Sequence, residues 1–593
     1  MKEFKKLLQF ADGYKLMYLF GMISIIISQA FNTIGPLIIR TAIDSIIGTE
    51  PITSSITQKI VNLLGGRDYL TNSLWVLGIL IVLNTAIRGI FLYFKNTFAS
   101  KSSENITMRI RNKLYDHIQR LPYEYHVKAE TGELIQKCTS DVDTIRRFLG
   151  IQLVEVAGSI FMLLFILWIM FILNIKMVFI SIAFLPFIFG FAVIFFKRVQ
   201  RDFEKSDDAE AKLSTTIQEN LTGIRVVKAF ARENFELEKF DIKNFDFRTK
   251  VNKMILNLSA YWAISDFLSM IQVGLVIVIG SYLVIIDEIT LGTLVAFITY
   301  VNMLIWPIRQ MGRTLTDMGK ASISIKRIDE ILVESIENLD QTGNKTKIIG
   351  NIDFNSVSFG YEQDRLVLED ISFRVKSGQT IAIIGSTGSG KSSLVHLLPR
   401  LYEYNKGSIK VDGVELNSID KHWIRKNVGL VLQEPFLYAK SIKENIKLAD
   451  PSMVDDKVFE AAKIASVHDD INSFEGKYET LVGERGVSLS GGQKQRMAIA
   501  RTIINDSPIV IFDDSLSAVD TETDISIRKA LKTRKNKATT IIISHRISTV
   551  AEADLILVMD KGHIVQRGTH KDLIEEEGLY KRVYTIQSSY EEE

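Results

Sequence analysis

This chain of 593 residues has a single cysteine and a net charge close to zero. Its only cysteine is Cys138, so the chain cannot form an intrachain disulfide. Cys138 lies in a polar stretch without neighbouring His or Cys, a setting that predicts neither a metal site nor a nucleophile. The formal net charge is only +2, so bulk charge gives no reason to expect a nucleic-acid partner. No small-residue cleavage site follows the first apolar run, and we therefore expect no removable signal peptide.

Apolar residues are abundant, and they gather in the first half of the chain. Hydrophobic residues make up 47% of a sequence that is also 24% charged, which predicts an apolar part joined to a polar part. Six apolar segments are each near or above the ~20 residues that cross hydrocarbon. They are Leu16–Ile39, Leu74–Phe94, Ile151–Leu173, Met177–Phe196, Leu258–Ile286 and Leu291–Ile308. Six in series predict a transmembrane domain rather than buried soluble helices.

Lysine and arginine are distributed unevenly between these segments. The N-terminal end is rich in lysine and the loops Lys95–Arg147 and Lys197–Lys253 are rich in lysine and arginine, whereas the connection Thr41–Asn72 carries only one of each. By the positive-inside rule, both termini and both long loops are expected in the cytoplasm. The mixture of apolar and charged residues predicts that the spans continue there as helices. Breaks at 120–126 and 223–230 predict a short transverse helix in each loop, with an ordinary helix–helix corner as the alternative.

A phosphate-binding loop organises the second half of the chain. Residues 385–392 read GSTGSGKS and match the pattern G-x-x-x-x-G-K-[ST]. An apolar strand precedes the loop, and a helix follows it and stops at Pro399. The glycines let backbone N–H groups turn around an anion, and the positive end of the helix points at the same spot. Lys391 can then reach the β- and γ-phosphates of a nucleotide, and the Ser392 hydroxyl can bind Mg²⁺.

A second motif narrows the kind of nucleotide site. Residues 489–493 read LSGGQ, and with this signature the chain resembles the ATP-binding cassette (ABC) family. The other family motifs follow in family order over roughly residues 350–585. The resemblance implies an adenine-stacking aromatic, a Q-loop glutamine, a Walker B acid that holds Mg²⁺ through water, a D-loop acid and a switch histidine. These are Tyr361, Gln433, Asp513, Asp520 and His545 respectively.

The resemblance therefore implies a complete set of site residues. The expected ATP-binding residues are Tyr361, Gly385, Ser386, Thr387, Gly388, Ser389, Gly390, Lys391, Ser392 and Ser393. The expected Mg²⁺ ligands are Ser392, Gln433 and Asp513, and the expected catalytic residues are Gln433, Asp514 and His545. The signature residues, which would close over ATP held by another nucleotide domain, are Leu489, Ser490, Gly491, Gly492 and Gln493. One P-loop and one signature predict a half-transporter that must dimerise.

The expected architecture joins two fold classes. It is an α-helical transmembrane domain of six spans with long cytoplasmic helical extensions, followed by an α/β P-loop ABC nucleotide-binding domain. We place the transmembrane domain at residues 1–335, a linker at 336–350 and the nucleotide-binding domain at 351–593. A polar run at 341–347 marks the linker. We expect a multi-pass protein of a bacterial plasma membrane.

Asp514 departs from the family pattern. The family has Glu directly after the Walker B Asp, where it polarises the attacking water. Asp is shorter by one methylene, about 1.5 Å of reach, and catalysis tolerates such misplacement poorly. The run 513–520 resembles the degenerate half of heterodimeric bacterial multidrug exporters, in which the partner supplies the Glu and this half supplies an intact signature. The alternative is a homodimer that works slowly with Asp514.

The transported substrate is poorly specified by the sequence. The leading reading is ATP-driven export of amphipathic small molecules, with a dedicated lipid or peptide exporter as one alternative. An alternative of another class is an ATP-gated channel or regulatory subunit. Arg88, Glu155 and Asp266 are ionisable residues within spans, where charge is costly. Either one of these acids meets a cationic substrate, or the charges pair between helices.

Overall fold

The computed structural model describes residues 13–52, 54–337, 343–362, 365–483, 489–517, 519–532 and 537–591. Their contacts divide them into two compact units. The first unit holds the chain up to Gln119 and again Ala129–Glu334, and the second holds Arg120–Lys128 and the chain from Ser335. Three parts of the regions discussed above lie outside the described residues, namely residues 1–12 at the N-terminal end, residues 338–342 of the linker and Ala518 of the D-loop (residues 517–520).

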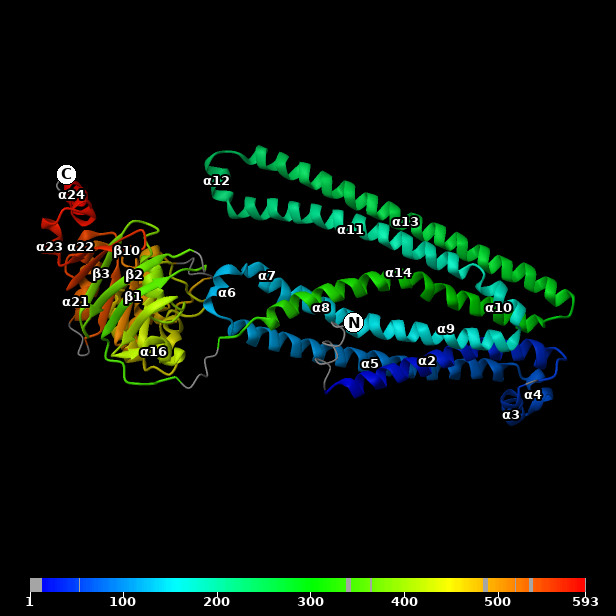
Figure 1. The fold of residues 1–593 in the computed structure, drawn as a ribbon. Coiled ribbons are helices and arrows are strands. Elements are labelled where there is room, and N and C mark those ends of the chain that lie inside the picture. Colours follow the sequence, from blue (N-terminus) through cyan, green and yellow to red (C-terminus); the bar gives the residue numbers. More distant parts are fainter. Residues whose placement is uncertain are drawn as a thin grey trace. The chain divides into compact units, whose positions relative to one another are not determined.

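The first unit is helical (Figure 1). Its described residues contain six helical stretches long and apolar enough to cross a membrane, which confirms the six spans expected from hydropathy. The helices that carry them are α2 (Lys15–Thr41), α5 (Trp75–Gln119), α9 (Leu153–Leu173), α10 (Ile175–Ile182), α11 (Leu185–Thr222), α13 (Glu233–Ile285) and α14 (Leu291–Val333). The fourth stretch comprises two of these helices, α10 and α11. Between α2 and α5 lie the short helices α3 (Ser55–Leu63) and α4 (Gly66–Asn72), and α9 is preceded by α7 (Thr131–Gln136) and α8 (Val142–Arg147).

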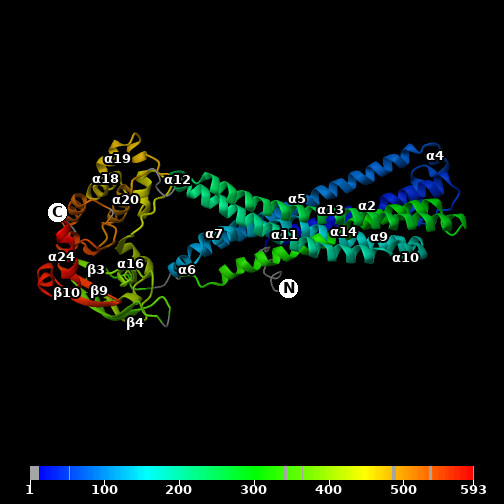
Figure 2. The same ribbon diagram turned by 90° about the horizontal axis from the view of Figure 1, so that it is seen from above.

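Several helices run on past their apolar segments without a break, as the charged loops predicted. α11 and α13 lie side by side over their length in both views (Figures 1 and 2). The short helix α12 (Ile224–Ala229) joins them at one end. The second predicted transverse helix is α6 (Tyr123–Lys128), and this helix belongs to the second unit. Both breaks in the loops are therefore short helices, as expected.

The fourth span is interrupted, which the sequence analysis did not foresee. α10 ends at Ile182, and α11 begins at Leu185 with a proline in its first turn. Gln272 of α13, which is fully buried, donates from Nε2 to the carbonyls of Ile180 (3.1 Å) and Ser181 (2.6 Å). Its Oε1 accepts from Phe184 N at 3.1 Å. One amide side chain thus satisfies the backbone groups that the break leaves open.

The second unit contains two sheets (Figure 2). An antiparallel sheet has the strand order β2-β1-β4-β5, and a six-stranded sheet has the order β10-β9-β3-β8-β7-β6. Within the six-stranded sheet every pairing is parallel except β10 with β9. The strands are β1 (Ile352–Phe359), β2 (Leu368–Val375), β3 (Thr380–Gly385), β4 (Lys406–Val411), β5 (Val414–Glu415), β6 (Val428–Val431), β7 (Ile509–Asp513), β8 (Thr539–Ile543), β9 (Leu555–Asp560) and β10 (His563–Gly568).

Helices complete this unit as an α/β fold, as expected from its alternating patterns. They are α15 (Lys391–Leu397), α16 (Lys421–Asn427), α17 (Ile442–Ile446), α18 (Asp455–Ile464), α19 (His468–Ser473), α20 (Gly491–Ile503), α21 (Thr521–Lys532), α22 (Ile547–Val550), α23 (His570–Glu575) and α24 (Leu579–Glu591). The central strands are buried on both faces. β7 and β8 have no exposed residue, and both are rich in isoleucine, as strands covered on both faces usually are.

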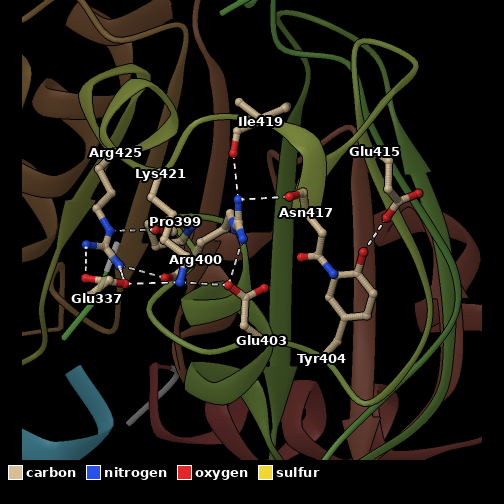
Figure 3. Close-up of polar contacts among 10 residues, drawn as sticks. All are labelled: Glu337, Pro399, Arg400, Glu403, Tyr404, Glu415, Asn417, Ile419, Lys421 and Arg425. Carbon is tan, nitrogen blue, oxygen red and sulfur yellow. Dashed lines mark hydrogen bonds and ion pairs between the residues drawn. The ribbon is translucent and has the colours of Figure 1, made fainter. Parts of the chain in front are cut away.

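A cluster of ion pairs ties the start of the second unit to α16 (Figure 3). The Arg425 guanidinium holds the Glu337 carboxylate with two bonds, of 2.8 and 2.7 Å, and Lys421 donates to Glu337 at 3.2 Å. Lys421 also pairs with Glu403, which in turn pairs with Arg400. Glu337 is only 10% exposed, and bidentate contacts of this kind are geometrically demanding. The cluster therefore fixes where the chain enters this unit.

Candidate nucleotide-binding site

Four predicted motifs meet at one edge of the six-stranded sheet. The P-loop begins at the carboxyl end of β3, and Asp513 is the last residue of β7. His545 follows β8, and Gln433 follows β6. β3, β8, β7 and β6 are successive parallel neighbours, so their carboxyl ends lie along the same edge. Open α/β sheets bind their ligands at this edge.

The P-loop backbone is shaped by its glycines. Gly388 and Gly390 have φ values of +80° and +96°, which other residues rarely adopt. A side chain at Gly385 would meet the carbonyl oxygen of Met559 at 2.1 Å, so this position also requires glycine. Ser389 is 1% exposed, and its Oγ has no hydrogen-bond partner among the described residues. The loop thus offers backbone N–H groups and a free hydroxyl in a confined space.

Lys391 is folded back over the loop. Its Nζ donates to the carbonyl oxygens of Gly385 (3.0 Å) and Ser386 (2.8 Å), and the side chain is only 7% exposed. Burial lowers the pKa of this ammonium group, while the nearby carboxylates of Asp514 and Asp513 act in the opposite direction. The ammonium group therefore sits between the loop and the two Walker B acids.

The Walker B acid is tied to the P-loop helix by two side chains. Ser392 Oγ donates to Asp513 Oδ1 at 2.8 Å, which brings two of the predicted Mg²⁺ ligands together. His396, one turn further along α15, places its Nε2 3.3 Å from Asp513 Oδ2. The sequence analysis did not single out His396. Its position four residues after Ser392, on the same face of a helix, is the signal that could have found it.

Asp514 directly follows Asp513 in the chain and is half-buried. Its φ is +46°, and its backbone N–H donates to Ile543 O at 3.1 Å. Burial raises the pKa of the Asp514 carboxyl group, with Asp513 adding to the rise and His545, Ser517 and Lys391 opposing it. Its Oδ1 is buried and has no hydrogen-bond partner among the described residues. The backbone of Asp514 is thus held by a hydrogen bond, while one oxygen of its short carboxylate side chain has no hydrogen-bond partner among the described residues.

Tyr361 belongs to a group of aromatic side chains that pack against one another. Its hydroxyl lies 2.8 Å from Ser393 Oγ, and its ring packs edge-on against Tyr402 with centroids 5.1 Å apart. Tyr402 in turn contacts Tyr123 of α6 at 5.5 Å. Tyr361 remains 42% exposed, so one side of the ring is open for stacking. The sequence analysis named Tyr361 but missed Tyr402, since no spacing rule links the two residues.

The signature forms a helix start. Ser490 is the N-cap of α20, where its Oγ accepts from Gln493 N at 3.3 Å and the Gln493 side chain accepts from Ser490 N at 3.1 Å. This reciprocal capping box holds the residues in a fixed shape at the positive end of a 13-residue helix. Asp520 caps α21 in a similar way by accepting from Thr523 N at 2.8 Å. Hydrogen bonds from Thr523 hold the pKa of Asp520 below its usual range.

Arg546, directly after the switch histidine, was missed by the sequence analysis. Its guanidinium donates to the carbonyls of Val519 and Ser517, both at 2.8 Å. These carbonyls belong to the D-loop, so Arg546 joins the D-loop to the segment that carries His545. The only sequence signal was a basic residue next to an assigned histidine, and its partners are backbone atoms that no motif specifies.

The donor set suits a nucleoside triphosphate with its divalent cation. The confined loop, Ser389 Oγ and Lys391 match phosphate oxygens, and Ser392 and Asp513 supply the oxygen ligands that Mg²⁺ prefers. Gln433 and His545 are exposed at the same edge, and the described residues bring neither into a side-chain contact with the P-loop. Leu489, Gly491 and Gly492 lie beside Ser490, at the start of α20.

Comparisons with known proteins show the family of this chain. Residues 18–308 match the family described as "ABC transporter transmembrane region", and residues 368–517 match the family described as "ABC transporter". The Bacillus subtilis protein "Uncharacterized ABC transporter ATP-binding protein YknU" is 35% identical over 590 residues, covering 99% of this chain and 98% of the relative. The chain belongs to the ABC transporter family.

A further relative and a solved structure indicate which kind of ABC transporter this chain resembles. The Bacillus subtilis protein named "Putative multidrug export ATP-binding/permease protein YgaD" is 32% identical over 592 residues, covering 99% of this chain and all of the relative. A solved structure, "Structure of a bacterial Atm1-family ABC exporter with ATP bound", matches with a TM-score of 0.78 at 26% identity, over 98% of this chain and 99% of that chain. The ABC transporter therefore has the half-transporter exporter fold. This fold is embedded in a membrane, binds ATP and assembles as a dimer with another ABC subunit.

Proposed function

We propose that this ABC transporter uses ATP hydrolysis to export amphipathic small molecules, as one half of a heterodimer with one degenerate ATP site. The observation that carries the asymmetry is Asp514, which stands where the family has Glu. The names of the relatives support the export of drugs, because several are named as multidrug export proteins. The domain assignment that goes with this proposal is residues 1–335 in the membrane, a linker at 336–350 and 351–593 for nucleotide.

The chain's own residues take up the following roles in the proposal. The P-loop and Lys391 bind the phosphates, and Tyr361 stacks on adenine. Ser392 and Asp513 hold Mg²⁺, with Gln433 near it, and the metal neutralises phosphate charge when it is bound. His545 lies near the γ-phosphate and is positioned by the same segment that Arg546 ties to the D-loop. Ser490 and Gly492 close over ATP in the P-loop of the other subunit.

Asp514 weakens only the site that uses this chain's own P-loop. Its side chain falls about one methylene, ~1.5 Å, short of the reach of Glu, and a misplacement of this order costs about 100-fold in rate. Its positive φ and the hydrogen bond from its N–H to Ile543 keep the backbone from moving forward to compensate. In a heterodimer, the other site joins the partner's Glu to this chain's Ser490 and Gly492 and hydrolyses ATP at the normal rate.

The test compares two substitutions in the complex purified with its native partner. Ser490→Arg blocks the site that contains the partner's Glu and is expected to reduce steady-state ATPase activity to near background. Asp514→Ala alters the slow site and is expected to reduce activity much less. A loss for Asp514→Ala equal to that for Ser490→Arg identifies Asp514 as a competent base and removes the case for a heterodimer.

Three alternatives are compatible with the same site. A homodimer would carry Asp514 in both sites, and purification of the native complex would then give one subunit species. An ATP-gated channel or regulatory subunit would suit a site that holds ATP longer than it cleaves it. Such a protein would let its ligand equilibrate across the membrane but would not concentrate it. A dedicated lipid or peptide exporter differs only in the substrate that stimulates turnover.

A further inference from the structure

A cavity of about 580 Å³ lies among the membrane helices of the first unit. It is lined by residues from α2, α5, α9, α11 and α14, so most of the spans contribute to it. Its volume falls within the usual range of small-molecule sites, about 300–1,000 Å³. The wall is largely apolar, and representative residues are Leu92, Met162, Phe189 and Trp306. This wall suits the apolar body of a ligand.

The charges in the cavity are unequal. Arg88 and Lys95 from α5 and Glu155 from α9 are its charged lining residues, so the lining carries a net positive charge. Glu155 interacts electrostatically with Lys95 but forms no ion pair with it. Asp266 does not alter the balance, because Arg309 pairs with it at 2.6 Å and neither residue lines the cavity. The structure thus favours pairing between helices for Asp266.

Lys95 is a buried cation in the lining of this cavity. Its side chain is 8% exposed and lines the cavity, yet it makes no hydrogen bond or ion pair with any residue that the structure describes. A charge removed from water without a partner is costly, and ionisable groups at membrane depth mark functional sites. Lys95 directly follows the apolar segment Leu74–Phe94, so the sequence analysis assigned it to the beginning of a loop. Only the helical fold brings it beside Glu155.

We propose that this cavity binds the exported substrate and that the substrate is an amphipathic anion. Its carboxylate, sulfonate or phosphate group contacts Lys95, with Arg88 adding attraction, and its apolar body lies against the Trp306 side of the wall. This inference rests on the proposed export function and gives that function a substrate class. Of the two alternatives left open for the acids within the spans, it disfavours a cationic substrate, since the one acid in the cavity is outnumbered by two cations.

The test is equilibrium binding to the full complex in phosphatidylcholine nanodiscs without ATP. The probes are 11-(dansylamino)undecanoic acid and an analogue of matched chain length that ends in trimethylammonium, and binding to empty nanodiscs is subtracted. We expect the anionic probe to bind at least about tenfold more tightly than the cationic one, as one charge-assisted contact predicts. Equal binding of the two probes, or tighter binding of the cation, would overturn the inference.

Substitutions of the charged cavity residues are expected to change the affinity for the anionic probe in opposite directions. Lys95→Met is expected to weaken binding of the anionic probe about tenfold or more, Lys95→Arg to retain it, and Glu155→Gln to strengthen it. Lys59→Met, on α3 outside the cavity, is the matched control and leaves binding unchanged. Full binding by Lys95→Met overturns the proposal, and so does loss in Lys95→Arg, because a retained charge must then be irrelevant.

Two further experiments identify the source of the anion and distinguish failure of the site from failure of the export function. Competition by phosphatidylglycerol in the nanodisc identifies the anion as a lipid headgroup, and its absence identifies a free amphiphile. Anion binding without ATP-driven accumulation refutes the export function while retaining the site. Uphill accumulation of an amphiphile by a complex that shows no preference for anions refutes the site and leaves export intact.

Discussion

Replacement of Glu337 by Gln removes the charge at the centre of the ion-pair cluster in Figure 3 while keeping the shape of the side chain. The two bonds to Arg425 and the bond to Lys421 all end on this carboxylate, which is 10% exposed. Breaking a fully buried pair costs about 3–5 kcal/mol, and breaking an exposed pair costs about 0–1 kcal/mol. Arg425 and Lys421 are 27% and 19% exposed, so we expect about 2 kcal/mol.

This loss is measurable as a lower melting temperature of the nucleotide-binding unit. A unit of this size loses about 2–4 °C per kcal/mol, so a shift of about 4–8 °C is expected by calorimetry of the full chain in nanodiscs. The transition that ATP raises identifies the unit. Glu403→Gln is the matched control, since Glu403 is 43% exposed and belongs to the same cluster. Its expected shift is smaller, about 0–4 °C for a loss of about 0–1 kcal/mol, and equal shifts for the two variants would refute the reasoning.

The same contribution depends on pH with a definite sign. Burial raises the pKa of Glu337, but hydrogen bonds and charge from Arg425 and Lys421 outweigh burial and hold it below its usual value of 4.5. The folded pKa is lowered, so the stabilisation is fully present above the unfolded value and is lost as pH falls through the folded value. The gap between wild type and Glu337→Gln should therefore be constant near neutral pH and shrink below about pH 4.5. A gap that widens on acidification contradicts this assignment.

Two further predictions concern nucleotide binding and topology. Lys391→Ala should weaken labelling of this chain's own site by a photoreactive ATP analogue roughly 10- to 100-fold, and Tyr361→Ala should weaken it less, since only stacking is lost; undiminished labelling of Lys391→Ala would overturn the assignment. In a Cys138→Ser background, Ser55→Cys should react with a membrane-impermeant thiol reagent in intact cells and Lys101→Cys should not; the reverse pattern would invert the proposed topology.

Motifs and hydropathy predicted much of the fold and of the candidate site. The P-loop and signature are local patterns whose chemistry depends on neighbouring residues in the chain, so a single sequence is enough to find them. The six spans follow from the length of apolar runs, and β7 follows from the Walker B motif, whose apolar residues end in Asp513. The two short helices at the breaks were found because proline or glycine interrupts a helical pattern there.

The rest depends on contacts between residues far apart in the chain. The proline at the start of α11 is a local signal for the break in the fourth span, but no local pattern indicates Gln272, about ninety positions away, which stabilises the break. Arg546 acts on backbone carbonyls, which carry no residue signature. Lys95 was assigned to a loop because hydropathy has no information about which helices surround a residue. In each case the tertiary packing, rather than the local pattern, decides the role.

Uphill transport is the measurement that tests the central claim most directly. Inside-out proteoliposomes that hold the native complex would be given 11-(dansylamino)undecanoic acid at equal concentration on both sides, followed by ATP. The account predicts that the lumenal concentration rises above the external one, and that Ser490→Arg, which blocks the competent site, abolishes the rise. If ATP never raises the lumenal concentration above the external one, and only speeds equilibration in a parallel sample that starts with unequal concentrations, the protein is a gated channel and not an exporter.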